Sequence, residues 1–219
     1  MSRLLFEKTG RAVWISHLDL MRLFQRAFKR AGLPLKHTQG YNPRPSVSIA
    51  LPLSVGMSSH CELLDFELDG TEVSCDIICQ KLNSTLVDGI RVLKVYDKGR
   101  KTGELTLLEC SVSFIYTNGA SDSAVSAIDA IFHSDELILP KKTKNGILEQ
   151  NIIPMIKRIS VSKKDDREIE LQALVCCQNP TLNLAQLSAA ISTYLPGYAP
   201  DYCMYVRREI FDAQEKVFR

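Results

Sequence analysis

The stretch SHLDLMRLFQRAFKRAGLP, residues 16–34, decides how the first half of the chain is expected to fold. Ser16 is a good N-cap, and Asp19 lies in the first turn, where the helix dipole favours a carboxylate. Gly32 and Pro34 then end the helix. The apolar residues fall on one broad face that must cover a sheet, and they are Leu20, Leu23, Phe24, Ala27, Phe28 and Ala31. The segment therefore predicts an amphipathic helix.

Strand-like segments and further helices surround this helix in an order that occurs twice, β-α-β-β-α-β. In the first copy the predicted strands are residues 3–10, 46–53, 61–70 and 90–96, and the second helix is 74–86. In the second copy the strands are 110–116, 153–162, 167–177 and 203–211, and the helices are 121–134, capped by Ser121 or Asp122, and 183–195, capped by Asn183.

This repeated order predicts an α+β protein made of two tandem ferredoxin-like domains with antiparallel sheets. We place them at residues 1–98 and 106–219, joined by the polar stretch DKGRKTGEL at 97–105, a linker or a long hairpin tip. Residues 139–151 interrupt the second copy. Their lysines and their glycine predict an exposed basic loop.

The composition is that of a globular protein, with 45% hydrophobic and 24% charged residues. The start of the chain lacks a secretory apolar region and no apolar run is long enough for a membrane helix, so we expect a cytoplasmic protein. The seven cysteines are scattered among apolar positions, which favours reduced thiols in the core. Their spacing fits neither a zinc site nor an iron–sulfur cluster, so we expect no metal or other cofactor in this chain.

Positive charge is concentrated at one end of a nearly neutral chain. Residues 1–50 hold nine Lys and Arg against two acidic residues, although the whole chain has a net charge of only +2. On the helix, Arg22, Arg26 and Lys29 line up opposite the apolar face, with Arg30 beside them. Like charges four residues apart destabilise a helix slightly, so this face favours anion binding over a merely solvated surface.

The loop after the helix continues the positive field and adds an aromatic ring. GYNPRP, residues 40–45, combines a flexible glycine, Tyr41 and two prolines that keep the backbone extended. Basic groups interleaved with an aromatic suit single-stranded RNA, although Tyr41 could equally pack or stabilise the turn. The predicted RNA- or anion-binding residues are Arg22, Arg26, Lys29, Arg30, Lys36, His37, Tyr41, Asn42 and Arg44.

Catalysis has little support in the residue pattern. Ser-His-Asp, Cys-His and paired-carboxylate arrangements cannot be argued from the spacing, and phosphate-binding glycine loops are absent. His17 and His37 are the two candidates for acid–base groups, with His17 more simply explained as a structural histidine. The pattern therefore favours a binding module over an enzyme.

The stretch SHLDLMRLFQRAFKRAGLPLKHTQGYNPRPSVSIALPLSVGMSS, residues 16–59, resembles the signature of the radical-SAM-linked proteins, a bacterial domain of unknown function. Arg44 departs from the pattern, because many members carry histidine there, and this argues against a catalytic or metal-binding turn. The resemblance implies association with, or fusion to, cobalamin-binding radical SAM proteins. The partner would carry the iron–sulfur cluster, S-adenosylmethionine and cobalamin.

These observations together predict an RNA-binding or substrate-positioning accessory for a radical SAM enzyme that modifies tRNA or ribosomal RNA. Three alternatives stay open. The chain could be a protein adaptor whose basic face docks on the radical SAM partner. It could be a metal-independent endoribonuclease that uses His17 or His37 with Tyr41, or it could bind a small anionic ligand such as a nucleotide.

Overall fold

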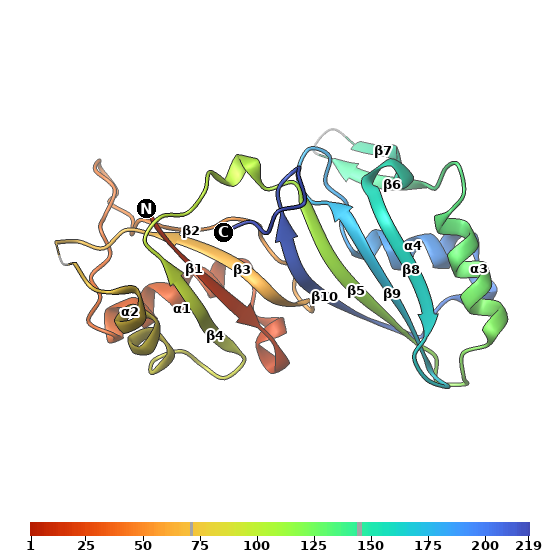
Figure 1. Ribbon diagram of the computed structural model, residues 1–219, viewed down its shortest axis with the longest axis horizontal. Helices are drawn as coiled ribbons and strands as arrows, with labels where there is room; N and C mark the ends of the chain where they lie inside the picture. Colours follow the sequence, from red (N-terminus) through yellow and green to blue (C-terminus); the bar gives the residue numbers. More distant parts are fainter. Residues whose placement is uncertain (71, 144–145) are drawn as a thin grey trace. The chain divides into compact units, whose positions relative to one another are not determined.

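The computed structural model describes residues 1–70, 72–143 and 146–219 (Figure 1). It shows a mixed α+β fold with mostly antiparallel strand pairs and four α-helices in the described part. The chain forms two compact units. The first is Met1–Glu104 together with Phe218–Arg219, and the second is Leu105–Val217. The last two residues thus belong to the first unit, whereas the sequence placed them in the second domain.

The first unit contains the predicted order of strands and helices. Its elements are β1 (Ser2–Lys8), a 3-10 turn (Gly10–Trp14), α1 (His17–Arg30), β2 (Val47–Ile49), β3 (Ser58–Phe66), α2 (Cys75–Asn83) and β4 (Ile90–Tyr96). The strands lie in the order β4-β1-β3-β2, and every neighbouring pair is antiparallel. Strand β2 is shorter than predicted, and β3 begins at Ser58, three residues earlier than predicted.

Helix α1 begins and ends where its sequence predicts. The Ser16 hydroxyl accepts a hydrogen bond from the Asp19 amide, and Gly32 takes the positive φ of +66° that ends the helix. The buried face packs two rings against the sheet, Phe24 on Phe6 at 4.8 Å between centroids and Phe28 on Phe66 at 5.0 Å. Each buried phenylalanine contributes roughly 2–3 kcal/mol, so this face fixes α1 on the sheet and turns the cations outward.

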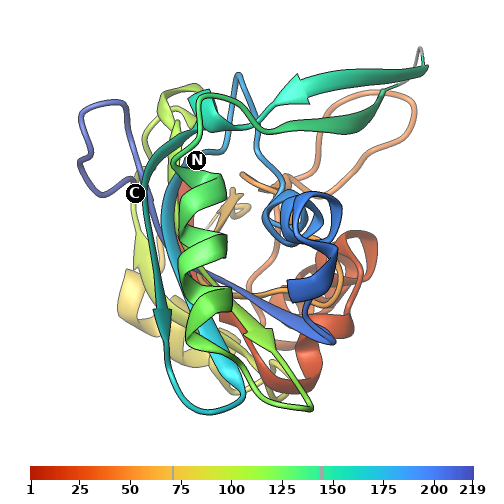
Figure 2. The ribbon, with the colours of Figure 1, turned by 90° about the vertical axis from the view of Figure 1, so that its right-hand side faces the viewer.

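The second unit repeats the strand order of the first. It contains β5 (Leu107–Ile115), α3 (Asp122–Phe132), β6 (Ile138–Thr143), β7 (Gly146–Asn151), β8 (Ile156–Lys163), β9 (Glu168–Cys176), α4 (Ala185–Tyr194) and β10 (Tyr202–Phe211). Its sheet runs β10-β5-β9-β8, again with antiparallel neighbours, and Figure 2 shows α3 and α4 on the same side of it. Ser121 caps α3, and the Asn183 side chain accepts a hydrogen bond from the Ala185 amide at the start of α4.

Residues 139–151 were predicted to form an exposed basic loop. Much of β7 is exposed, but the segment forms two strands and is not a loop. Strands β6 and β7 pair there as a hairpin, which extends away from the sheet in Figure 2. Its base is held by the hydroxyl of Tyr194, which donates to the carbonyl of Ile138 and accepts from the amide of the same residue. Leu139 is buried and so gives β6 an inward side. Lys144, one of the lysines that suggested a loop, lies outside the described residues.

A buried ion pair anchors the first strand of the first unit. The guanidinium of Arg3 is 1% exposed and donates from Nε and Nη2 to the two carboxylate oxygens of Asp65, at 2.6 and 2.8 Å. The ring of Phe218 lies 5.2 Å from the Arg3 Cζ atom, and a Cβ atom on Gly99 would approach Nε to 2.5 Å. The end of the chain and the segment after β4 therefore enclose this guanidinium.

Candidate nucleic-acid interface

The outward face of α1 carries cations that differ in how far they are neutralised. At its start, Arg22 donates to the Asp19 carboxylate at 3.1 Å, and the Ser16 hydroxyl donates to the same carboxylate at 2.8 Å. The Ser16 hydrogen bond and then the Arg22 hydrogen bond hold the pKa of Asp19 below its ordinary value. Asp19 therefore stays ionised and offsets much of the Arg22 charge.

Farther along α1, Arg26 and Lys29 are exposed and have no ion-pair partner among the described residues. Both line a cavity of about 570 Å³ beside the last turns of the helix. Gln25 of the same helix also lines the cavity, and the rest of the lining comes from the segment after the helix and consists mainly of apolar residues and His37. The full set is Gln25, Arg26, Lys29, Gly32, Leu33, Pro34, Leu35, His37 and Pro45. Two unpaired cations thus stand at the rim of an apolar hollow.

The segment after α1 forms a hairpin-like loop that presents an aromatic ring. His37 and Pro45 form an isolated β-bridge, the Thr38 amide donates to the Arg44 carbonyl, and the Arg44 amide donates to the Thr38 hydroxyl. Tyr41 at the tip is fully exposed, so the packed role left open by the sequence does not occur. Asn42 and Arg44, which belong to the same loop, are exposed as well. We call residues 36–46 the tyrosine loop.

Two of the predicted binding residues are engaged elsewhere. Arg30 donates from Nη2 to the carbonyl of Thr85 at 2.7 Å, which ties the end of α1 to the segment after α2. Lys36 pairs with Glu67 at 3.5 Å and lines a different cavity of about 600 Å³, whose wall also carries Glu72 and Asp97. The cations that remain for a ligand are therefore chiefly Arg26 and Lys29, with Arg44 on the tyrosine loop.

The two histidines do not form a pair. His17 is the first residue of α1, whereas His37 lines the cavity beside Arg26 and Lys29. Nine residues separate His17 from Arg26, which is about 14 Å along a helix axis. The endoribonuclease hypothesis pairs one of these histidines with Tyr41, and it does not need both histidines at one substrate.

Sequence reasoning missed the floor of the cavity and an exposed apolar pair. Gly32 and Pro34 were read as the end of the helix, and Leu33 and Leu35 were given no part in a site. The cavity that they line becomes visible only once the tyrosine loop folds back beside them. Trp14 and Leu18, which are 71% and 67% exposed, flank the start of α1. Trp14 precedes the helix and Leu18 falls outside its apolar face, and this was the available signal.

The cysteines form no disulfide, and the described residues contain no group of three His, Cys, Asp or Glu that could hold a metal ion. Burial, helped by a hydrogen bond to Asp97, raises the pKa of Cys75 to about 11. Burial likewise raises the pKa of Cys110 to about 12. These thiols are therefore protonated at neutral pH and are poor nucleophiles and metal ligands.

Among the residues that the structure describes, no helix has both the length and the apolar character needed to cross a membrane.

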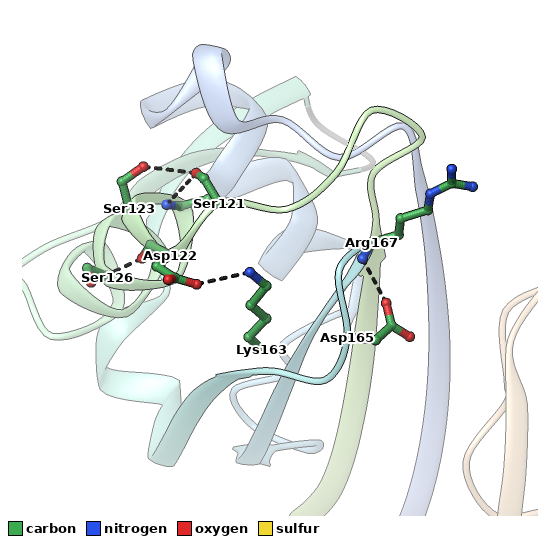
Figure 3. Close-up of polar contacts among 8 residues, drawn as sticks. Ser121, Asp122, Ser123, Ser126, Lys163, Asp165 and Arg167 are labelled. Atoms are coloured by element: carbon green, nitrogen blue, oxygen red, sulfur yellow. Dashed lines mark hydrogen bonds and ion pairs between the residues drawn. The ribbon is translucent and has the colours of Figure 1, made fainter.

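A polar cluster in the second unit is satisfied by its own contacts (Figure 3). Lys163 at the end of β8 donates to the Asp122 carboxylate at the start of α3, at 3.0 Å. The hydroxyl of Ser121 caps α3, and the Asp165 carboxylate accepts from the Arg167 amide at 2.7 Å in the turn after β8. The guanidinium of Arg167 points away from α3 in Figure 3. We interpret this cluster as the support of a turn and a helix start.

Fold and surface thus define a two-unit α+β protein with unpaired cations around a cavity on its first helix. A family model matches residues 2–184, and the chain belongs to that family, described as "Uncharacterized protein conserved in bacteria (DUF2344)". No curated protein matches the sequence significantly.

Solved structures show similarity to the chain. A chain in the crystal structure of a Cbf5-Nop10-Gar1 complex aligns with a TM-score of 0.53 and 9% identity, over 95% of this chain and 48% of that one. The present chain therefore spans about half the length of that chain, and the likeness shows the fold alone. An unknown protein from Galdieria sulphuraria aligns over 94% of this chain and 97% of its own, with 10% identity and a TM-score of 0.26, too low to establish a shared fold.

Proposed function

We propose that this protein binds RNA and positions it for a radical SAM enzyme that modifies tRNA or ribosomal RNA. The observation that carries the proposal is the pair Arg26 and Lys29, exposed and without an ion-pair partner among the described residues, next to a loop that presents Tyr41 to solvent. Exposed cations attract phosphates and release their counterions, and an exposed aromatic ring offers a stacking surface to an unpaired base.

The enzyme partner follows from the resemblance of residues 16–59 to radical-SAM-linked proteins. In this proposal the chain is a non-catalytic cytoplasmic module, and the partner carries the iron–sulfur cluster, S-adenosylmethionine and cobalamin. The strand orders β4-β1-β3-β2 and β10-β5-β9-β8 support two tandem ferredoxin-like domains, because both have the fourth strand beside the first and the third between the first and the second. Such a sheet leaves one face for helices and presents α1 as a rigid platform.

The test is RNA binding by the Arg26→Gln, Lys29→Gln double variant over a range of salt concentrations. Each phosphate contact contributes a slope of about one to the salt dependence, so we expect the double variant to bind more weakly and to lose about two from the slope. RNA recovered by crosslinking to the purified protein supplies the probe.

The matched control is Lys81→Gln, Lys98→Gln, which removes two exposed lysines of the same unit that lie away from the cavity. A slope equal in the two variants would contradict the proposal, because the α1 cations would then have no special part in binding.

A protein adaptor is the second candidate, and the exposed Trp14 and Leu18 favour it. Exposed tryptophan is the side chain most often found at the energetic centre of a protein interface. If Trp14→Ser abolished capture of the radical SAM protein while RNA binding were absent from the unaltered chain, the adaptor function would replace the RNA-binding one.

A further inference from the structure

The cavity beside α1 has the shape and chemistry of a pocket and is more than a gap between charged side chains. Its volume of about 570 Å³ falls within the usual range for small-ligand sites. The last turns of α1 contribute Arg26 and Lys29, and the backbone beyond the helix contributes Leu33 and Leu35. Cations therefore stand on one side of the hollow. Leu33 and Leu35 lie almost buried beneath its floor, and Pro34 and Pro45 add apolar carbon that is more exposed.

Hydrogen bonds and burial hold this floor in place. The amide of Leu33 donates to the Phe28 carbonyl at 3.0 Å, and the Pro34 carbonyl accepts from the Asp69 amide at 2.8 Å. Leu35 forms a β-bridge with Leu68. Because Leu33 is 1% exposed and belongs to the core, the floor cannot move without disturbing the packing of the first unit. A ligand would meet a preformed surface, which reduces the entropy lost on binding.

Phosphate alone does not explain an apolar floor. A duplex presents its backbone to a cationic face and keeps its bases stacked and paired, so it would contact Arg26 and Lys29 and leave the hollow unused. An unpaired nucleotide can turn its flat, weakly hydrated base toward aliphatic carbon while its phosphates remain on the cations. The side chains of Gln25 and His37 also line the hollow and can reach the edge of such a base.

We propose that this cavity receives one unpaired base of a single-stranded RNA, with the flanking phosphates on Arg26 and Lys29. The inference rests on the proposed function and adds to it the strandedness of the RNA and the place where a base is held. Apart from the two cations, Gln25 and His37 are the polar side chains in the described lining that can hydrogen-bond to the edge of a base. Because these two groups are few, we expect the cavity to discriminate only weakly between the four bases.

The experiment compares three probes of equal length: a single-stranded RNA oligonucleotide, the same sequence in a blunt duplex, and an abasic oligomer that keeps the sugar and phosphate backbone. Affinity and its salt dependence are measured for each. We expect the duplex and the abasic oligomer to bind roughly tenfold or more weaker than the single strand, because each lacks an available base. Equal affinity for all three, with a normal salt dependence, would overturn the inference and leave the proposed function intact. If none of the three probes bound, both this inference and the proposed function would be rejected.

The position of the base is tested with 4-thiouridine in the single-stranded probe, followed by crosslinking and mapping of the modified residues. We expect crosslinks on residues 33–37 or on Gln25 and Pro45, and we expect the preference for the single strand to persist in Tyr41→Ala. Crosslinks confined to Tyr41, together with loss of the preference in Tyr41→Ala, would place the base on the tip of the tyrosine loop and overturn the cavity assignment.

Discussion

Asp19 combines two roles at the start of α1, since it pairs with Arg22 and exchanges hydrogen bonds with Ser16 through both its amide and its carboxylate. The pKa of Asp19 is lowered, first by Ser16 and then by Arg22. A carboxyl group whose pKa is lowered by folding stabilises the protein above its unfolded pKa, and this contribution disappears as the pH falls through the folded pKa.

We predict that Ser16→Ala raises the pKa of Asp19 more than Arg22→Gln does, as measured by NMR titration of the carboxyl carbon. Ser16→Ala also removes the cap and should lower the free energy of unfolding by about 1 kcal/mol at neutral pH. The difference in the free energy of unfolding between Ser16→Ala and the unaltered protein should become smaller in acid, because Asp19 is protonated in both proteins there. A larger change in the pKa of Asp19 in Arg22→Gln than in Ser16→Ala would show that Arg22, and not Ser16, is the main cause of the lowered pKa.

At the level of single residues, the sequence predicted which side chains are cationic and exposed but could not predict their partners. Arg30 was grouped with Arg26 and Lys29 by helical spacing, yet its guanidinium reaches the Thr85 carbonyl, 55 positions away. Lys36 was assigned to the same surface and pairs with Glu67 instead. Such contacts depend on which loops the fold brings together, and no local pattern carries that information.

At the level of elements, the Tyr194 hydroxyl on α4 helps to hold the base of the β6–β7 hairpin. Tyr194→Phe removes both hydrogen bonds between its hydroxyl and the backbone of Ile138. We predict that the base of the hairpin opens more easily by about 1 kcal/mol, because a net hydrogen bond is worth about that much and water replaces it only in part. Hydrogen exchange of the Ile138 amide should accelerate roughly fivefold, with little change in global unfolding.

Tyr202→Phe is the matched control, because Tyr202 is largely exposed and the described residues include no hydrogen-bond partner for its hydroxyl. Equal acceleration at Ile138 in both variants would show that the Tyr194 hydroxyl does not hold the hairpin.

Elements with explicit start and stop signals were predictable, and the hairpin was not. Helix α1 begins after Ser16 and ends before Gly32, and α3 begins after Ser121, as the sequence indicates. In β6, Pro140 and adjacent lysines mask the alternation that normally marks a strand, although a proline is tolerated on a hairpin edge. The pairing of β6 with β7 outweighs these weak local preferences.

At the level of the whole molecule, the first unit is closed by the end of the chain. Phe218 is fully buried, and its ring lies within 5.2 Å of the Arg3 Cζ atom and within 5.1 Å of the Arg100 Cζ atom. We predict that Phe218→Ala lowers the free energy of unfolding by about 3 kcal/mol or more, since the substitution leaves a cavity over a buried ion pair. Hydrogen exchange should lose protection in β1 and β3 more than in β5 and β9.

Val217→Ala serves as the control, because Val217 is half-exposed and adjacent in sequence. Unchanged protection of β1 in Phe218→Ala would mean that the Arg3–Asp65 pair is stable without its aromatic cover. The sequence indicated a repeated element order, but nothing in it placed the last two residues on the first unit, because the contact joins positions at opposite ends of the chain.

The enclosure of Arg3 by Phe218 also constrains how this chain can be rearranged by recombination. A gene fragment encoding residues 1–104 would specify every strand and helix of the first unit and still omit the ring that covers its buried cation. To move the complete first unit into another protein, recombination would have to transfer residues 1–104 and also the segment with Phe218, which residues 105–217 separate from them. The first unit therefore depends on two residues that the chain supplies only after the whole of the second unit.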